Sequence, residues 1–238
     1  MSKHQTIYQE EANAYQELIS REDYQGLLLP ALEAICDFRG KDIVEFGAGT
    51  GRLTCMLAPM AKSIKAFDAA GPMLGVAEVQ LKALGIQDFS LKVADNENIP
   101  LPDQCADITI EGWSFGHLVG WNLDNWQLSV QRAMNEFLRI LRPGGTAIII
   151  ETLGTGETEP KIPREWLGEF YGLLENEYGF TRSWCRTDYQ FTSVEEADRL
   201  VRFFFGDELA DRIVEEKLTI LPECTGIWSY TKGSTNTN

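Results

Sequence analysis

Three glycines at alternate positions, Gly47, Gly49 and Gly51, separate an apolar run that ends at Phe46 from a segment with helically spaced apolar residues. This pattern predicts a buried strand, a tight turn and a helix. Glycine allows positive φ and leaves no Cβ between the backbone and a ligand lying across a helix N-terminus. We therefore predict that the turn cradles a small molecule. A turn that only connects strand and helix is the alternative.

An acidic residue, Glu45, stands two positions before the first glycine. A carboxylate there would repel a pyrophosphate and would suit a cationic ligand. Nicotinamide and flavin enzymes also space the third glycine one residue further along, as G-x-G-x-x-G. The early third glycine and Glu45 therefore argue against a dinucleotide.

Two stretches resemble motifs of one enzyme family. The run Val44–Gly51 resembles the first motif of class I S-adenosylmethionine-dependent methyltransferases, and Leu138–Gly145 before the predicted strand Thr146–Glu151 is typical of them. The similar motifs span about residues 40–155. The resemblance implies an α/β, Rossmann-like, doubly wound and mainly parallel seven-stranded sheet, with S-adenosyl-L-methionine as cofactor.

Polar residues at the ends of other predicted strands fit a nucleoside. Asp68 follows the predicted strand 63–67 and could accept hydrogen bonds from both ribose hydroxyls, although an aspartate in a surface loop is the alternative. After the predicted strand 89–94, Asp95 and Asn96 could pair with the edge of adenine. The resemblance implies cofactor contacts at Glu45, Gly47, Ala48, Gly49, Gly51, Asp68, Ala69, Met73, Asp95, Asn96, Glu111 and Tyr15.

His117 is the candidate catalytic residue, because it follows the predicted strand 107–111 in a loop expected to face the methyl group. Methyl transfer is an in-line displacement, so a base is needed only when the acceptor must lose a proton. Imidazole titrates near neutral pH and could take that proton. A histidine that only packs in the loop is the alternative. Nearby aromatic residues could line an acceptor pocket or belong to the core.

The rest of the chain divides around this motif region. Residues 1–38 are predicted to form an N-terminal helical lid within the same domain, or helices that only cover a sheet edge. Residues 39–232 form the predicted methyltransferase domain, and 233–238 a polar tail. Helices are expected near 164–178, from Ser193 and over 207–218. By resemblance, strands near 180–189 and 224–230 complete the sheet as an antiparallel hairpin, and 154–163 is an exposed loop or gate.

Composition limits the possible functions. The 238 residues are 44% hydrophobic, as expected for one α/β domain, and the net charge of −15 argues against a nucleic-acid partner. No apolar run approaches a membrane span, and the first residues lack the apolar stretch of a secretion signal, so we expect a cytoplasmic protein without a membrane partner. Five scattered cysteines and two histidines predict no metal site.

These features together predict a methyltransferase that uses S-adenosyl-L-methionine to methylate a small molecule. A nicotinamide-dependent oxidoreductase and a non-catalytic S-adenosylmethionine-binding module are the alternatives. The acceptor, its reacting atom and the oligomeric state remain open at this level.

Overall fold

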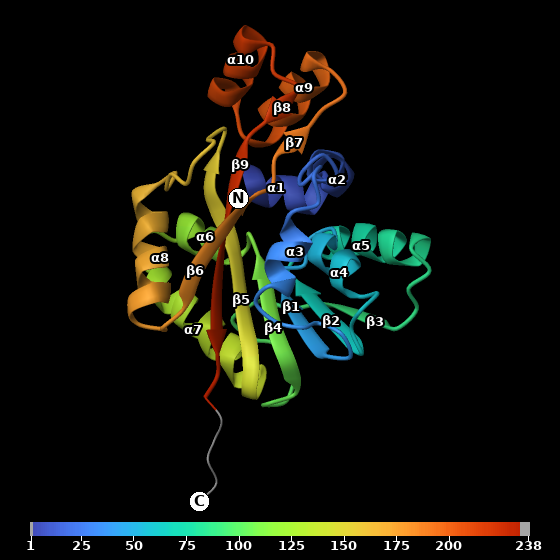
Figure 1. Cartoon of the computed structure of the whole chain (residues 1–238), viewed down its shortest axis with the longest axis vertical. Helices are drawn as coiled ribbons and strands as arrows, with labels where there is room; N and C mark the ends of the chain where they lie inside the picture. Colours follow the sequence, from blue (N-terminus) through green and yellow to red (C-terminus); the bar gives the residue numbers. More distant parts are fainter. Residues whose placement is uncertain (1, 234–238) are drawn as a thin grey trace, which may run out of the picture.

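A seven-stranded sheet with helices on both faces forms the body of the protein (Figure 1). The computed structural model describes residues 2–233, so Met1 and residues 234–238 of the predicted tail lie outside it. The strand order is β3-β2-β1-β4-β5-β9-β6. The strands are β1 (Asp42–Phe46), β2 (Ser63–Asp68), β3 (Phe89–Val93), β4 (Ala106–Gly112), β5 (Leu141–Thr155), β6 (Thr181–Arg186) and β9 (Glu223–Thr231).

The pairing confirms the predicted mainly parallel sheet. The five strands β1 to β5 run parallel to one another. Strand β9 is antiparallel to both β5 and β6, as the predicted final hairpin requires. Successive residues of β1 pack on opposite faces: Ile43 joins the core under α3 (Leu28–Glu33) and α4 (Arg52–Leu57), and Val44 joins the core on the other face. That other face carries α7 (Trp126–Ile140) and α8 (Glu165–Asn176), and α5 (Gly71–Ala83) precedes β3.

Two elements differ from their predicted extents. The loop after β4 contains a helix, α6 (Phe115–Trp121), because Phe115 and Val119 are fully buried against α7. Strand β5 begins at Leu141 instead of Thr146, since Leu141 already pairs with Ala106 of β4. Its far end reaches Thr155 and takes in the first residues of the predicted loop 154–163.

The N-terminal segment divides into two parts. Helices α1 (Lys3–Glu10) and α2 (Ala12–Ile19) are called the lid here. Helix α3, predicted as part of the lid, instead buries Leu28 and Leu32 in the core on one face of the sheet. The lid is therefore shorter than residues 1–38.

A second covering layer comes from the chain between β6 and β9. It contains β7 (Tyr189–Gln190), α9 (Val194–Phe204), α10 (Asp207–Glu216) and β8 (Ile220–Leu221), with β7 and β8 paired in a small sheet. This unit, called the cap here, lies beyond the end of the main sheet next to α2 (Figure 1). Leu18 of α2 is buried in the core of the cap, so lid and cap pack as one cover.

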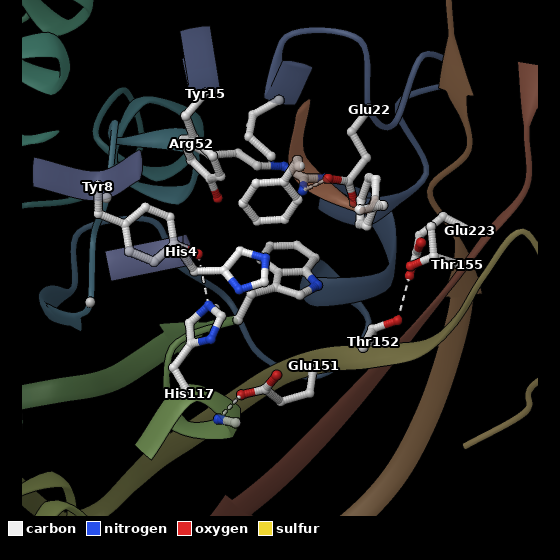
Figure 2. Close-up of a pocket in the computed structure, with 18 of the residues that line it drawn as sticks. His4, Tyr8, Tyr15, Glu22, Arg52, His117, Glu151, Thr152, Thr155 and Glu223 are labelled. Atoms are coloured by element: carbon white, nitrogen blue, oxygen red, sulfur yellow. Dashed lines mark hydrogen bonds and ion pairs between the residues drawn. The ribbon is translucent and has the colours of Figure 1, made fainter. Parts of the chain in front are cut away.

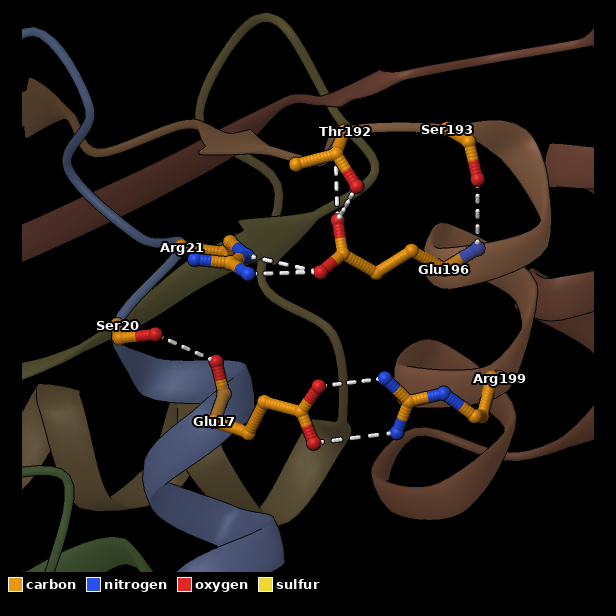
Figure 3. Close-up of polar contacts among 7 residues, drawn as sticks. All are labelled: Glu17, Ser20, Arg21, Thr192, Ser193, Glu196 and Arg199. Carbon is orange, nitrogen blue, oxygen red and sulfur yellow. Dashed lines mark hydrogen bonds and ion pairs between the residues drawn. The ribbon is translucent and has the colours of Figure 1, made fainter.

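Ion pairs also join the lid to the cap (Figure 3). Arg21, just after α2, donates to Glu196 of α9 at 2.7 Å, and Glu17 pairs with Arg199 on the exposed side. Glu196 also accepts hydrogen bonds from the backbone and hydroxyl of Thr192. Across residues 2–233, no helix has the length and apolar character needed to cross a bilayer.

Candidate functional site

Two adjoining cavities open at the carboxyl ends of the parallel strands, beneath the lid and the cap. The Asp68 cavity, of about 380 Å³, is bordered by Asp68, Asp95 and Asn96. The Glu151 cavity, of about 360 Å³, is bordered by Glu151 and Glu223 (Figure 2). The two share walls formed by Tyr8, Tyr15, Gly47, Gly49, Gly112, Trp113 and His117.

The glycine turn lies where the two cavities meet. Gly47, Gly49 and Gly51 all have positive φ, at +61°, +54° and +86°. A Cβ on Gly47 would lie 2.3 Å from Ser114, and one on Gly51 would lie 2.8 Å from the Cβ of Ala77. Beside Gly49 the nearest atom is the methyl of Met73, at 3.6 Å. Gly47 and Gly51 therefore allow close packing, and Gly49 is the position that exposes bare backbone to a ligand.

Asp68 connects the turn to the end of β2. Its carboxylate accepts hydrogen bonds from the backbone N–H of Gly49 at 2.8 Å and of Ala70 at 2.7 Å. Burial raises the pKa of Asp68, and these two bonds oppose the shift. The structure places Asp68 beside the other predicted cofactor residues in the wall of the Asp68 cavity, namely Tyr15, Gly47, Gly49, Ala69, Met73, Asp95 and Asn96.

Glu45 and Glu111 have different surroundings. Glu45 borders the Glu151 cavity with Ala48, accepts a hydrogen bond from Thr54 at 2.6 Å, and has its pKa raised to about 8 by burial. Glu111, predicted to contact the cofactor, is fully buried outside the walls of both cavities. Its carboxylate accepts hydrogen bonds from the N–H groups of Ser114 and Phe115, so it secures the start of α6 instead. Gly51 also lies off both walls.

His117 lies in the shared wall and contacts the lid. Its Nε2 is 2.8 Å from the hydroxyl of Tyr8, and its ring stacks on Trp121 with centroids 4.9 Å apart. Burial lowers the pKa of His117 to about 4, with a smaller contribution from His4. The imidazole is therefore neutral at pH 7, and its titration lies below the neutral range expected from the sequence. Proton removal by His117 stays a prediction.

The sequence reading missed two carboxyl groups in the wall. Glu151 lies on β5 and accepts a hydrogen bond from the N–H of Gly116 at 2.6 Å. Glu223 begins β9 and accepts one from the hydroxyl of Thr152 at 2.7 Å. Glu151 could have been found, because it stands at the carboxyl end of a predicted parallel strand. Glu223 had no such signal, since only the antiparallel return of β9 brings it to this edge.

An ion pair ties the cover to the helix after the glycine turn. Arg52 Nη1 lies 2.6 Å from Glu22 Oε2, and the guanidinium stacks over Trp113 with its carbon 4.3 Å from the ring centroid. The hydroxyl of Tyr189, from the cap, donates to Glu22 at 2.8 Å. Trp113 adopts a φ of +56°, a strained value for a residue with a side chain. This arrangement fixes the wall between turn and cap (Figure 2).

The described residues contain no cluster of three or more His, Cys, Asp or Glu side chains that could hold a metal ion.

Comparisons with known proteins find similarity to methyltransferases. A family described as a methyltransferase domain matches residues 44–149. The malonyl-[acyl-carrier protein] O-methyltransferase of Yersinia pestis is 32% identical over 124 residues, which cover 52% of this chain and 40% of that protein. The demethylmenaquinone methyltransferase of Thermus thermophilus is 32% identical over 114 residues, covering 47% of each. The chain thus spans less than half the length of these curated relatives.

A solved structure shows the same fold over more of the chain. The S-adenosylmethionine-dependent methyltransferase of Aquifex aeolicus superposes with a TM-score of 0.55 at 16% identity, covering 84% of this chain and 87% of that one. The matched domain contains the glycine turn at the end of β1, and the solved structure has the same fold. Residues 44–149 are thus similar to a methyltransferase domain, and the chain has the fold of a solved S-adenosylmethionine-dependent methyltransferase.

Proposed function

We propose that the protein transfers the methyl group of S-adenosylmethionine to a small molecule. The observation that carries this proposal is the meeting of two cavities at one wall, formed by the glycine turn, Trp113 and His117. One cavity has the groups that a nucleoside needs, and the other offers separate room for an acceptor. Two ligands in adjoining cavities are what a displacement between a donor and an acceptor requires.

The residues of the Asp68 cavity fit the cofactor. Asp68 retains free lone pairs beyond its two backbone hydrogen bonds and could accept from ribose hydroxyls. Asp95 and Asn96 could meet the adenine edge, Met73 its face, and Gly49 the amino-acid end. Glu45, whose carboxyl is buried behind the turn, suits the cofactor's ammonium group. When bound, the cofactor supplies an activated methyl group on a sulfonium.

The chain's contribution would be to position the acceptor and exclude water. Tyr8 and Tyr15 of the lid reach both cavities, and Phe204 and Phe205 of the cap reach the Glu151 cavity. A covered apolar site keeps water from competing with the acceptor. Proton removal by His117, predicted from the sequence, is tested below against a role in holding the lid.

A nicotinamide-dependent oxidoreductase and a non-catalytic S-adenosylmethionine-binding module fit the site less well. A nicotinamide enzyme would place a pyrophosphate on the turn, next to the buried carboxyl of Glu45. A binding module would not need the second cavity. The names of the relatives, which act on a malonyl-[acyl-carrier protein] and a demethylmenaquinone, support methyl transfer without identifying this acceptor. The net charge of −15 supports a partner other than nucleic acid, and a cytoplasmic location remains part of the proposal.

Calorimetry with S-adenosylhomocysteine and with NAD tests the proposal, together with a matched pair of variants. Gly49→Val places a side chain on the exposed backbone of the turn and should abolish S-adenosylhomocysteine binding. Gly85→Val is the control, because Gly85 also has positive φ, at +75°, and has open space around it. Binding of NAD instead, or equal S-adenosylhomocysteine affinity in a folded Gly49→Val protein, would exclude the proposed cofactor site.

A further inference from the structure

Four glutamates border the Glu151 cavity; Glu22 is paired with Arg52, and the other three lie at increasing distance from the glycine turn. Glu45 lies on β1, Glu151 on β5 and Glu223 on β9, in a sheet ordered β1-β4-β5-β9 at this point. Neighbouring strands are about 4.8 Å apart, so β5 and β9 lie about 10 Å and about 14 Å from β1. Glu151 and Glu223 border the Glu151 cavity but not the Asp68 cavity. They are therefore placed to meet the acceptor.

Both distant carboxyl groups are deeply buried and incompletely bonded. Glu223 is 2% exposed, and its Oε2 is buried without a hydrogen-bond partner among residues 2–233. Glu151 is 4% exposed, and its second oxygen points toward the middle of the cavity in Figure 2. Burial raises the pKa of each group to about 8. A buried acceptor atom without a partner is costly, so a ligand that donates hydrogen bonds would relieve that cost.

The basic residues in the same wall do not neutralise these carboxyl groups. Arg52 is paired with Glu22, and Arg164 is exposed at the start of α8. Burial lowers the pKa of His4 and His117, which leaves both rings neutral at pH 7. Ionised carboxylates in this cavity therefore need a positive charge from the ligand. Aromatic rings that could also face a cation or an apolar body come from Tyr8, Tyr15, Trp166, Tyr189, Phe204 and Phe205.

We propose that the methyl acceptor is an amine with an apolar or aromatic body, which enters as an ammonium ion and donates hydrogen bonds to Glu151 and Glu223. This inference deepens the proposed function and rests on it. An ammonium group has N–H donors for both carboxylates, and opposite charges stabilise each other strongly in a buried site.

The chemistry balances with Glu151 as the proton acceptor. Binding of the ammonium ion displaces the proton of Glu151 to solvent, and the resulting carboxylate then takes one proton from the ammonium ion, which frees the nitrogen lone pair. The nitrogen–carbon bond then forms as the sulfur–carbon bond of the donor breaks, and the bonding pair stays on sulfur. The product is a methylated ammonium ion and a neutral thioether. A carboxyl group whose pKa is raised toward neutrality is suited to accept this proton.

Binding to the protein saturated with S-adenosylhomocysteine tests the inference. The probes form three triplets, and each triplet consists of an amine, an alcohol and a carboxylate on the same body. The three bodies are butyl, 2-phenylethyl and 2-(indol-3-yl)ethyl. In at least one triplet, the amine should bind about tenfold or more tightly than the alcohol and the carboxylate. Mass spectrometry with S-adenosylmethionine should then detect N-methylation of that amine. Equal or weaker binding of the amine in every triplet would overturn the inference.

Variants test whether Glu151 and Glu223 are the groups that bind the amine. Glu151→Gln and Glu223→Gln should each remove about tenfold or more of the amine affinity and leave S-adenosylhomocysteine affinity unchanged. The control is Glu159→Gln, which removes the same charge from an exposed residue outside the cavity. Unchanged amine affinity in both variants would overturn the assignment. Failure of S-adenosylhomocysteine to bind the unaltered protein would instead count against the proposed function itself.

Discussion

Tyr8 of the lid and His117 of α6 are joined by a hydrogen bond of 2.8 Å, although 109 residues separate them along the chain. Because Tyr8 approaches the cavities from α1 and His117 from α6, this bond joins the lid to the wall between the two cavities. The same histidine could therefore act as a base or as a contact that keeps the lid closed.

A matched pair of variants separates these roles. With a pKa lowered to about 4, His117 is a weak base at pH 7, so we expect His117→Asn and Tyr8→Phe to slow turnover by the same factor, below about tenfold. The measurement is kcat with an acceptor from the amine panel. A loss of about 10²–10⁴-fold in His117→Asn alone would instead support the base predicted from the sequence.

Asp68 provides the prediction for the ribose. Asp68→Ala removes a carboxylate that could hold both hydroxyls, and hydrogen bonds to charged groups contribute about 1.5–3 kcal/mol. We expect S-adenosylhomocysteine affinity to fall by about ten- to hundredfold, as measured by calorimetry. The 2′-deoxy analogue should lose less, because one of the two hydroxyls is already missing. An equal loss for both ligands would point to disturbance of the Gly49 turn, whose N–H Asp68 also binds.

The glycine turn and Asp68 could be predicted from the sequence because both depend on local signals, a glycine spacing and a strand end. Glu111 shows the limit of that reasoning. Its place at the end of β4 was predicted, but its carboxylate bonds the backbone of Ser114 and Phe115 as α6 begins there. Side-chain direction depends on tertiary packing that a strand pattern does not encode.

The acceptor side of the site could be predicted least. Its cover is built where α2 packs on the cap, and one buried cluster there contains residues far apart in the sequence, such as Leu18 and Leu200. The helices of the cap were predicted from Ser193 and near residues 207–218, but no local signal places them over the sheet edge. Glu223 reaches the cavity because β9 returns antiparallel beside β5.

The attachment of lid to cap yields a prediction about motion. The Arg21–Glu196 pair is partly buried, and Glu196 also binds Thr192, whereas Glu17 and Arg199 are exposed. Glu196→Ala should therefore speed amide hydrogen exchange in α2 by about tenfold or more. Glu17→Ala, the matched control, should change it by less than about fivefold, as exposed ion pairs contribute little. Equal effects of the two changes would contradict this assignment of the stabilising contact.

The buried carboxyl of Glu223 should make stability depend on pH in the ligand-free protein. Burial raises its folded-state pKa from 4.5 to about 8, so the stability present below pH 4.5 is lost as pH rises toward 8. The reason is that the unfolded chain ionises this group freely and the folded chain resists doing so. Glutamine cannot ionise and keeps an oxygen for the hydroxyl of Thr152. Glu223→Gln should therefore gain stability relative to the unaltered protein between pH 5 and pH 8.5.

Urea unfolding of both proteins at several pH values in this window measures that difference. Groups that titrate alike in the two proteins cancel in the comparison, which isolates position 223. Glu159→Gln is the control, and its difference should stay constant because Glu159 is exposed. A Glu223→Gln difference that is also constant, or that moves in favour of the unaltered protein as pH rises, would show that Glu223 is ionised in the folded state. The amine would then meet a carboxylate that is already charged before binding.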